Sequence, residues 1–133
     1  MKNIIMDLDG TLTIDEDDKD YANKKPNIAV IEKLKEYKMK GFKITIYTSR
    51  NMRTFMGDIE KIKANTLPQI ITWLEKHSVP YDDVMIGKPW CGFDGFYVDD
   101  KAIRPSEFST LSYEEIRDLL KKEYSLNVPK ELE

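Results

Sequence analysis

The chain has little of the two residue types on which many metal centres and catalytic sites depend. It contains a single cysteine, Cys91, and a single histidine, His77, among 133 residues. One cysteine excludes an internal disulfide and a cysteine-rich zinc site. One histidine, placed at the end of a predicted helix where it complements the helix dipole, argues against a histidine-based metal site or a Ser-His-Asp triad. Any chemistry therefore has to come from carboxylates, hydroxyls and cationic side chains.

The sequence also lacks a basic excess and a long apolar run. Its 21 Lys and Arg residues are outnumbered by 24 Asp and Glu residues, which gives a net charge of −3 and no basic stripe for a nucleic acid. No apolar run approaches the length of a membrane span, and the chain starts directly with a predicted strand. We therefore expect a cytoplasmic protein without a signal peptide, a membrane partner or a nucleic-acid partner. Its length fits a single domain over residues 1–133.

What the sequence does have is two aspartates directly after an apolar run at the start of the chain. Ile4 to Met6 predict a short buried strand, and Asp7 and Asp9 follow it. Residues two apart in a strand point to the same side, so these carboxylates should project together and repel unless a cation lies between them. The alternative is that Asp9-Gly10 forms a type I′ hairpin turn with solvated aspartates.

Three further predicted strands also end in polar residues. The four strands cover residues 4–6, 42–47, 84–86 and 96–98, and the residues after them are Asp7 and Asp9; Thr48, Ser49 and Arg50; Lys88; and Asp99 and Asp100. A helix predicted over 28–37 connects the first two strands, which makes a βαβ unit with parallel strands. Since ligands bind at the carboxyl edge of open α/β sheets, these polar groups should gather there.

The remaining segments are predicted from their patterns as well. Residues 14–25 are polar and are read as a loop or short hairpin flap beside the aspartates. Residues 51–65 suit a loop or irregular helix, and the apolar spacing predicts helices over 66–77 and 113–124. Ser112 and Glu115 form a capping-box pattern at the start of the last helix.

Carboxylates, a hydroxyl and a lysine at one sheet edge suit phosphoryl transfer. Mg²⁺ prefers oxygen ligands, which Asp7 and the Asp99/Asp100 pair can supply. One carboxylate can act as the nucleophile, and a second can protonate the leaving group and then deprotonate water. Lys88 could offset the negative charge of the phosphoryl group, and Thr48 could donate a hydrogen bond to its oxygens.

These residues, in this order, resemble the four motifs of the haloacid dehalogenase superfamily of phosphatases. The first motif is Asp7-Leu8-Asp9-Gly10-Thr11-Leu12-Thr13, followed by Thr48, Lys88 and Asp99-Asp100. The resemblance covers residues 1–105. Within it, the segments 48–54, 87–92 and 95–105 look like the small capsular polysaccharide biosynthesis phosphatases.

The resemblance implies a role for each motif residue. Asp7 would be the nucleophile and a Mg²⁺ ligand, and Asp9 the general acid/base with its backbone carbonyl on the metal. Thr48 would hydrogen-bond the phosphoryl oxygens, and Lys88 would neutralise charge on Asp7 and the phosphate. The metal would also be held by Asp99 and Asp100, directly or through water, with Asp100 favoured as the direct ligand.

Three residues outside the general motifs are candidates for substrate binding. Arg50, Asn51 and Arg53 could grip the leaving group or a second anionic group, and the alternative is that they belong to a surface helix. Neither inter-motif interval is long enough for a large cap domain. The site should therefore be open, covered by the flap, by 51–65 or by the partner subunit of a homo-oligomer.

The sequence thus predicts an α/β, three-layer Rossmann-like fold with a central parallel sheet and no large cap. The predicted function is a Mg²⁺-dependent phosphomonoesterase that forms an aspartyl-phosphate. Its small-molecule substrate would be a phosphorylated sugar or nucleotide-sugar precursor of a capsule polysaccharide. The alternatives are a nucleic-acid-end phosphatase, which the acidic charge disfavours, and a receiver-like phospho-acceptor switch. Asp9, two residues after the candidate acceptor, favours turnover over storage of the phosphoryl group.

Overall fold

The computed structural model describes residues 2–16 and 20–127 of the chain. By its internal contacts the chain divides into two compact units, Met1–Trp90 and Cys91–Glu133. The single domain expected over residues 1–133 stays a prediction. Among the described residues, no helix combines the length and the apolar character that crossing a bilayer requires.

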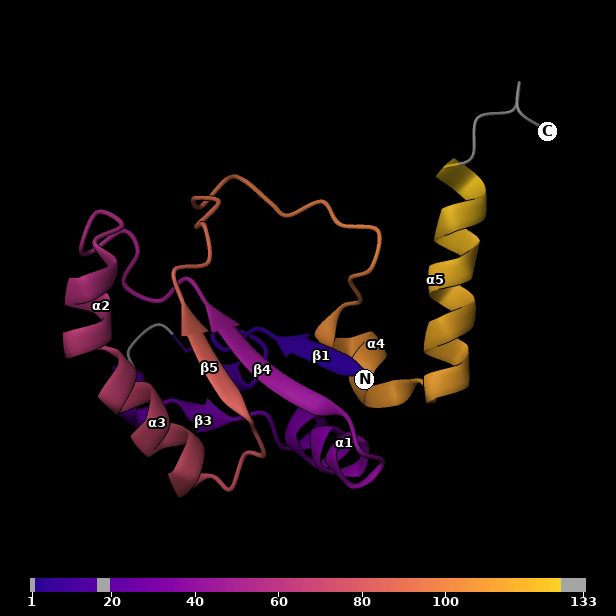
Figure 1. Cartoon of the computed structure of the whole chain (residues 1–133), viewed down its shortest axis with the longest axis horizontal. Coiled ribbons are helices and arrows are strands. Elements are labelled where there is room, and N and C mark those ends of the chain that lie inside the picture. The colour runs from indigo at the N-terminus through magenta and orange to yellow at the C-terminus, as the bar shows by residue number, and fades with distance from the viewer. Residues whose placement is uncertain (1, 17–19, 128–133) are drawn as a thin grey trace. The chain divides into compact units, whose positions relative to one another are not determined.

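The first unit is built on a three-stranded parallel sheet in the order β1-β4-β5 (Figure 1). Its strands are β1 (Asn3–Met6), β4 (Lys43–Thr48) and β5 (Asp83–Ile86). Met6 lies opposite Ile46, and Thr48 lies opposite Ile86, so all three strands end at the same edge. The first three predicted strands and their parallel arrangement are confirmed.

The core of the first unit forms where the helices bury their apolar positions. The central strand β4 carries a nearly continuous buried run, as expected of a parallel strand between two neighbours. Asn27 is the N-cap of helix α1 (Ile28–Met39), and its side chain accepts a hydrogen bond from the Val30 amide. The helix buries Val30, Ile31, Leu34 and Tyr37. Helix α3 (Leu67–Lys76) buries Ile70, Trp73 and Leu74. Both helices lie where the apolar spacing predicted them.

The segment between β4 and α3 combines turns with a short helix. Residues 50–57 form consecutive turns, and helix α2 (Ile59–Asn65) follows with Asp58 as its N-cap. This agrees with the expected loop or irregular helix over 51–65.

The flap predicted over 14–25 is a small hairpin. Strand β2 (Thr13–Ile14) pairs antiparallel with β3 (Lys25–Pro26), and the 3-10 turn η1 (Tyr21–Asn23) lies between them; residues 17–19 are outside the described part. Because β1 pairs with β4 and β2 pairs with β3, Asp9-Gly10 does not join two paired strands. The type I′ hairpin interpretation of Asp9-Gly10 is therefore wrong.

Within residues 91–127, the described part of the second unit, there are two helices. They are α4 (Pro105–Thr110) and α5 (Tyr113–Asn127). The capping box at the start of α5 is confirmed: the Glu115 amide donates to the Ser112 hydroxyl at 3.1 Å, and the Ser112 amide donates to the Glu115 carboxylate at 2.9 Å. Helix α4 was not predicted, because its six residues are too few to show an apolar period.

The strand predicted over 96–98 does not form, which corrects the sequence analysis. Phe96 and Val98 are 78% and 88% exposed, and no described residue pairs with this run in a ladder. Aromatic and β-branched residues favour strands because they fit a pleated, half-buried surface, so a three-residue run without such a surface stays irregular. On α5, Ile116 is buried, whereas Leu119 is 36% exposed.

Trp73 provides a direct test of how α3 holds the flap. Its indole N–H donates to the backbone carbonyl of Lys24 at 2.9 Å, and both groups are buried. Trp73→Phe leaves this carbonyl without its donor, so we expect the free energy of unfolding to fall by about 1–3 kcal/mol. Urea denaturation measures the change, with Trp90→Phe as the control, because Trp90 is 38% exposed. Equal stability of the two variants would contradict the structural role of this bond.

Candidate active site

The turn after β1 presents the two aspartates. The carbonyl of Leu8 accepts the backbone amides of Thr11, Leu12 and Thr13 at 3.2, 2.9 and 3.1 Å. Gly10 has a φ of 80°, a left-handed conformation that glycine adopts without strain. Leu8 and Leu12 are fully buried. The tight turn and the two buried leucines fix the backbone from which Asp7 and Asp9 project.

Asp7 lies beside a lysine at the carboxyl edge of the sheet. Its Oδ1 is 3.4 Å from the Lys88 ammonium, and its Oδ2 accepts the Thr11 hydroxyl at 3.0 Å. The Lys88 amide also donates to the Thr48 carbonyl at 3.1 Å, which joins the ends of β4 and β5. The Asp7 side chain is 35% exposed. The structure thus brings Asp7, Thr48 and Lys88 to one edge, with an Asp7 carboxylate that solvent can reach.

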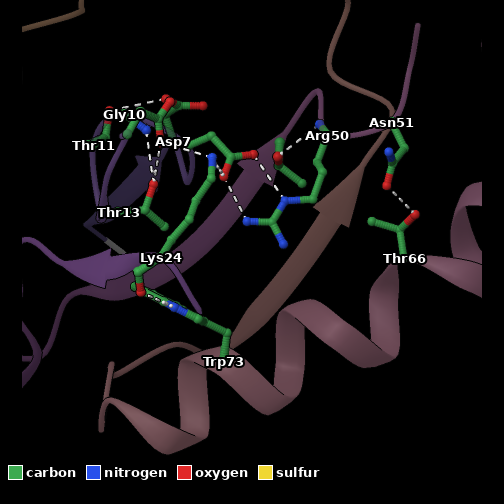
Figure 2. A network of polar contacts seen from close by, with 12 residues as sticks. Asp7, Gly10, Thr11, Thr13, Lys24, Arg50, Asn51, Thr66 and Trp73 are labelled. Atoms are coloured by element: carbon green, nitrogen blue, oxygen red, sulfur yellow. Dashed lines mark hydrogen bonds and ion pairs between the residues drawn. The ribbon is translucent and has the colours of Figure 1, made fainter. Parts of the chain in front are cut away.

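Asp9 is held by two cations from other parts of the chain. Arg50 binds it in a bidentate manner, through Nε to Oδ2 at 3.0 Å and Nη2 to Oδ1 at 2.7 Å. The Lys24 ammonium also reaches Oδ1, at 3.0 Å (Figure 2). The side chains of Arg50 and Lys24 are only 1% and 10% exposed. The site therefore contains a buried cluster in which one carboxylate is shared between two positive charges.

The cations control the ionisation of Asp9. Burial alone would raise the pKa of the Asp9 carboxyl, but the hydrogen bonds and charges of Arg50 and Lys24 outweigh burial and hold the pKa below 3.8. Burial likewise would lower the pKa of Lys24, but its bonds to Asp15 and Asp9 raise that pKa above 10.5. Each partner thus stabilises the charged form of the other.

Tyr21 of the flap adds an aromatic face to this cluster. Its ring centroid is 4.1 Å from the guanidinium carbon of Arg50 and 4.9 Å from the Lys24 ammonium. Cation–π attraction of this kind strengthens when the groups are shielded from water. Nη1 of Arg50 is buried and has no hydrogen-bond partner among the described residues, which leaves the aromatic ring as a close neighbour of this guanidinium. The polar flap shows no period, so its sequence pattern gives no sign of this role of Tyr21.

Thr48 and Asn51 both make hydrogen bonds within the protein. The Thr48 hydroxyl oxygen accepts the Arg50 amide at 3.0 Å, and Thr48 is 1% exposed. The Asn51 side chain accepts from the Thr66 hydroxyl at 2.7 Å and donates to Thr54 at 3.2 Å. Asn51 has a φ of 63°, so these bonds brace a strained turn after β4. Figure 2 shows Asn51 meeting Thr66 at the start of α3.

The three predicted substrate-binding residues therefore occupy different environments. Arg50 is buried against Asp9, and Asn51 braces the turn after β4. Arg53 is exposed, and its guanidinium carbon lies 5.8 Å from the ring centroid of Trp90. The surface-helix alternative does not hold, because residues 50–57 form turns.

The predicted metal ligands are divided between the two units. Asp7 and Asp9 belong to the first unit, and Asp99 and Asp100 belong to the second, where Asp99 accepts the Lys101 amide at 2.8 Å. Over residues 2–16 and 20–127, no three His, Cys, Asp or Glu side chains are grouped as a metal site. The chemistry of the donors fits Mg²⁺, since every predicted ligand atom is oxygen and the Asp7 carboxylate is accessible. The four-residue metal site stays a prediction.

The ion pairs of Asp9 predict how stability depends on pH. Because the folded pKa of Asp9 lies below 3.8, its ionised form stabilises the fold fully above this value, and that contribution is lost as pH falls through the folded pKa. Lys24→Met removes one of the two cations, so the folded pKa rises and this contribution becomes smaller. Urea unfolding of the wild type and variant between about pH 7 and pH 2 measures the difference.

The control for this measurement is Lys35→Met, which removes a lysine from an exposed pair with Glu32. Exposed pairs contribute little, so its pH curve should follow that of the wild type. If the curves of Lys24→Met and the wild type also coincide, Lys24 does not stabilise the Asp9 carboxylate.

Comparisons with known proteins show the family and the fold of this chain. A crystal structure of a protein from Vibrio cholerae is 56% identical, with a TM-score of 0.90, and the match covers 92% of this chain and 99% of that chain. A structure of the Pnkp1/Rnl/Hen1 RNA repair complex is 18% identical with a TM-score of 0.49, covering 97% and 32% of the respective chains, a likeness too low to support an argument. No curated protein matches the chain. A family model described as haloacid dehalogenase-like hydrolase matches residues 4–130. The chain therefore belongs to the haloacid dehalogenase-like hydrolase family.

Proposed function

We propose that the chain is a Mg²⁺-dependent phosphomonoesterase that works through a phosphorylated Asp7. The observation that carries this proposal is the contrast between the two aspartates. Asp7 is accessible and lies 3.4 Å from the Lys88 ammonium, whereas Asp9 is bound by two buried cations. Two carboxylates in different environments suit different chemical roles.

In the first step, an Asp7 carboxylate oxygen attacks phosphorus and the ester P–O bond breaks. The leaving alkoxide takes a proton from Asp9, and the product is the alcohol with a phosphoryl group on Asp7. In the second step, Asp9 removes a proton from water, the resulting oxygen attacks phosphorus, and the Asp7–phosphorus bond breaks. Inorganic phosphate leaves, and both aspartates return to their starting forms.

The environment of Asp9 suits the second step directly. A general base must be ionised, and Arg50 and Lys24 hold the Asp9 carboxyl in that form by keeping its pKa low. The first step needs the protonated form. The proposal therefore requires these ion pairs to weaken when a phosphate dianion binds near the cations.

Lys88 supports the transfer from the other side of Asp7. Its ammonium lies at Oδ1 of Asp7, where it can offset negative charge as the phosphoryl group approaches. Lys88 is held at this position because its own amide bonds the end of β4. The Thr48 hydroxyl is proposed to donate to a phosphoryl oxygen, in keeping with its place at the same sheet edge.

Hydrolases of this family generally use Mg²⁺, and we propose the same for this chain. The ligands would be the Asp7 carboxylate, the Asp9 carbonyl and the Asp99/Asp100 pair. When bound, the ion would offset charge on the phosphoryl oxygens.

The proposed substrate is a small phosphorylated carbohydrate-type metabolite of surface-polysaccharide biosynthesis. This rests on the resemblance of segments 48–54, 87–92 and 95–105 to the capsule-biosynthesis phosphatases. The absence of a cap among the described residues suits a substrate larger than a simple phosphate ester. A second copy of the chain is proposed to cover the open site, and neither a nucleic acid nor a membrane is proposed as a partner.

Phosphate release from p-nitrophenyl phosphate tests the proposed activity. Asp7→Asn removes the nucleophile, so turnover should fall by on the order of a thousandfold or more. EDTA should abolish turnover of the wild type, and added Mg²⁺ should restore it. The matched control is Asp118→Asn, an exposed aspartate on α5 that should leave the rate unchanged. Turnover that continues without divalent metal would refute the proposal.

A further inference from the structure

We propose that Arg53 and Trp90 together form a subsite for the leaving group of a ring-bearing phosphomonoester that carries a second anionic group. Trp90 would stack on the ring, and Arg53 would bind the second anion. This inference rests on the proposed phosphatase function and specifies the substrate class of the same site.

In the sequence, both residues come shortly after a residue whose side chain contacts one of the aspartates. Trp90 comes two residues after Lys88, whose ammonium lies 3.4 Å from Asp7. Arg53 comes three residues after Arg50, which binds Asp9 at 2.7 Å. A chain extends by at most about 3.6 Å per residue, so Trp90 lies within about 7 Å of Lys88 and Arg53 within about 11 Å of Arg50, measured between Cα atoms. In this proposal, a substrate whose phosphate lies at Asp7 has its leaving group near this pair.

The two side chains are already arranged as a pair. The guanidinium carbon of Arg53 is 5.8 Å from the ring centroid of Trp90, within the range of a cation–π contact. This contact orders the arginine before a ligand arrives. An ordered arginine loses less conformational freedom on binding than an isolated surface side chain does.

Trp90 differs from the other tryptophan in its exposure. The other tryptophan, Trp73, is 2% exposed and has its indole N–H bonded, whereas Trp90 is 38% exposed at the end of the first unit. A partly exposed indole two residues after Lys88 offers a flat, apolar face for a sugar or base ring. Its neighbour Arg53 adds a planar donor fork that matches a carboxylate or phosphate.

The other two candidates for binding a second anion are already engaged. The side chain of Arg50 is 1% exposed, and two of its N–H groups donate to Asp9. The amide of Asn51 accepts from Thr66 and donates to Thr54. Arg53 is the exposed member of the three predicted substrate residues, so a ligand arriving from solvent reaches it more readily than the buried Arg50.

The test compares phosphate release from four esters. Methyl phosphate has no ring, glucose 6-phosphate has a ring, glucose 1,6-bisphosphate has a ring and a second anion, and uridine monophosphate has a base.

For Trp90→Ala, kcat/KM for the ring-bearing esters relative to methyl phosphate should fall about tenfold. A larger fall for the glucose esters than for uridine monophosphate identifies a sugar as the ring, and the reverse identifies a base. For Arg53→Gln, the ratio of the bisphosphate to glucose 6-phosphate should fall about tenfold.

The matched control is Lys43→Gln, which removes an exposed cation at the amino end of β4, the opposite edge of the sheet. All substrate ratios should stay at their wild-type values in this variant. If Trp90→Ala and Arg53→Gln lower turnover of all four esters equally, the pair has only a structural role and the subsite is refuted. If the wild type hydrolyses neither methyl phosphate nor p-nitrophenyl phosphate, the proposed phosphatase function fails instead.

Binding without turnover provides a second readout. In the Asp7→Asn background, glucose 1,6-bisphosphate should change the tryptophan fluorescence, because Trp90 is exposed while Trp73 is buried. The change should vanish when Trp90→Phe is added. A fluorescence change that persists in the double variant would overturn the assignment of Trp90.

Discussion

The site depends on the shared ion pair of Asp9 with Arg50 and Lys24. These three residues come from the turn after β1, the end of β4 and the flap, so the cluster ties together segments far apart in sequence. Burying charges costs solvation energy, which is recovered only when the geometry is good and the donors are satisfied. The bidentate arginine meets the geometric condition, whereas its buried Nη1 has no hydrogen-bond partner among the described residues. Removing one partner of such a pair typically costs about 3–5 kcal/mol. The same contacts orient the carboxylate that is proposed to transfer protons.

The cluster also connects the flap to Asp9, the proposed acid/base. Lys24 directly precedes β3, and the indole of Trp73 on α3 donates to its backbone carbonyl while its ammonium reaches Asp9. Tyr21 covers the guanidinium of Arg50 from η1. The flap position and the orientation of Asp9 are therefore set by one group of contacts. Asp7 lies outside this group and stays accessible, which separates the proposed nucleophile from the proposed acid/base.

Sequence patterns predicted the parts of the structure that depend on local periodicity. The β1, β4 and β5 strands, the α1 and α3 helices and the Ser112–Glu115 cap all follow from spacing and capping chemistry. The strand over 96–98 was wrong because a short apolar run shows propensity but not whether a neighbouring strand exists. Arg50 was predicted to bind substrate, and its burial against Asp9 depends on tertiary contacts that no local pattern reveals. The role of Tyr21 was missed for the same reason.

The central claim is that Asp7 carries the phosphoryl group during turnover. The most direct measurement is acid quenching of the wild-type protein during hydrolysis of p-nitrophenyl phosphate in Mg²⁺, followed by peptide mapping by mass spectrometry. The account predicts the added mass of one phosphoryl group on the peptide that contains Asp7, at that residue. A phosphoryl group on any other residue, or steady turnover with no phosphorylated peptide at any quench time, would contradict it.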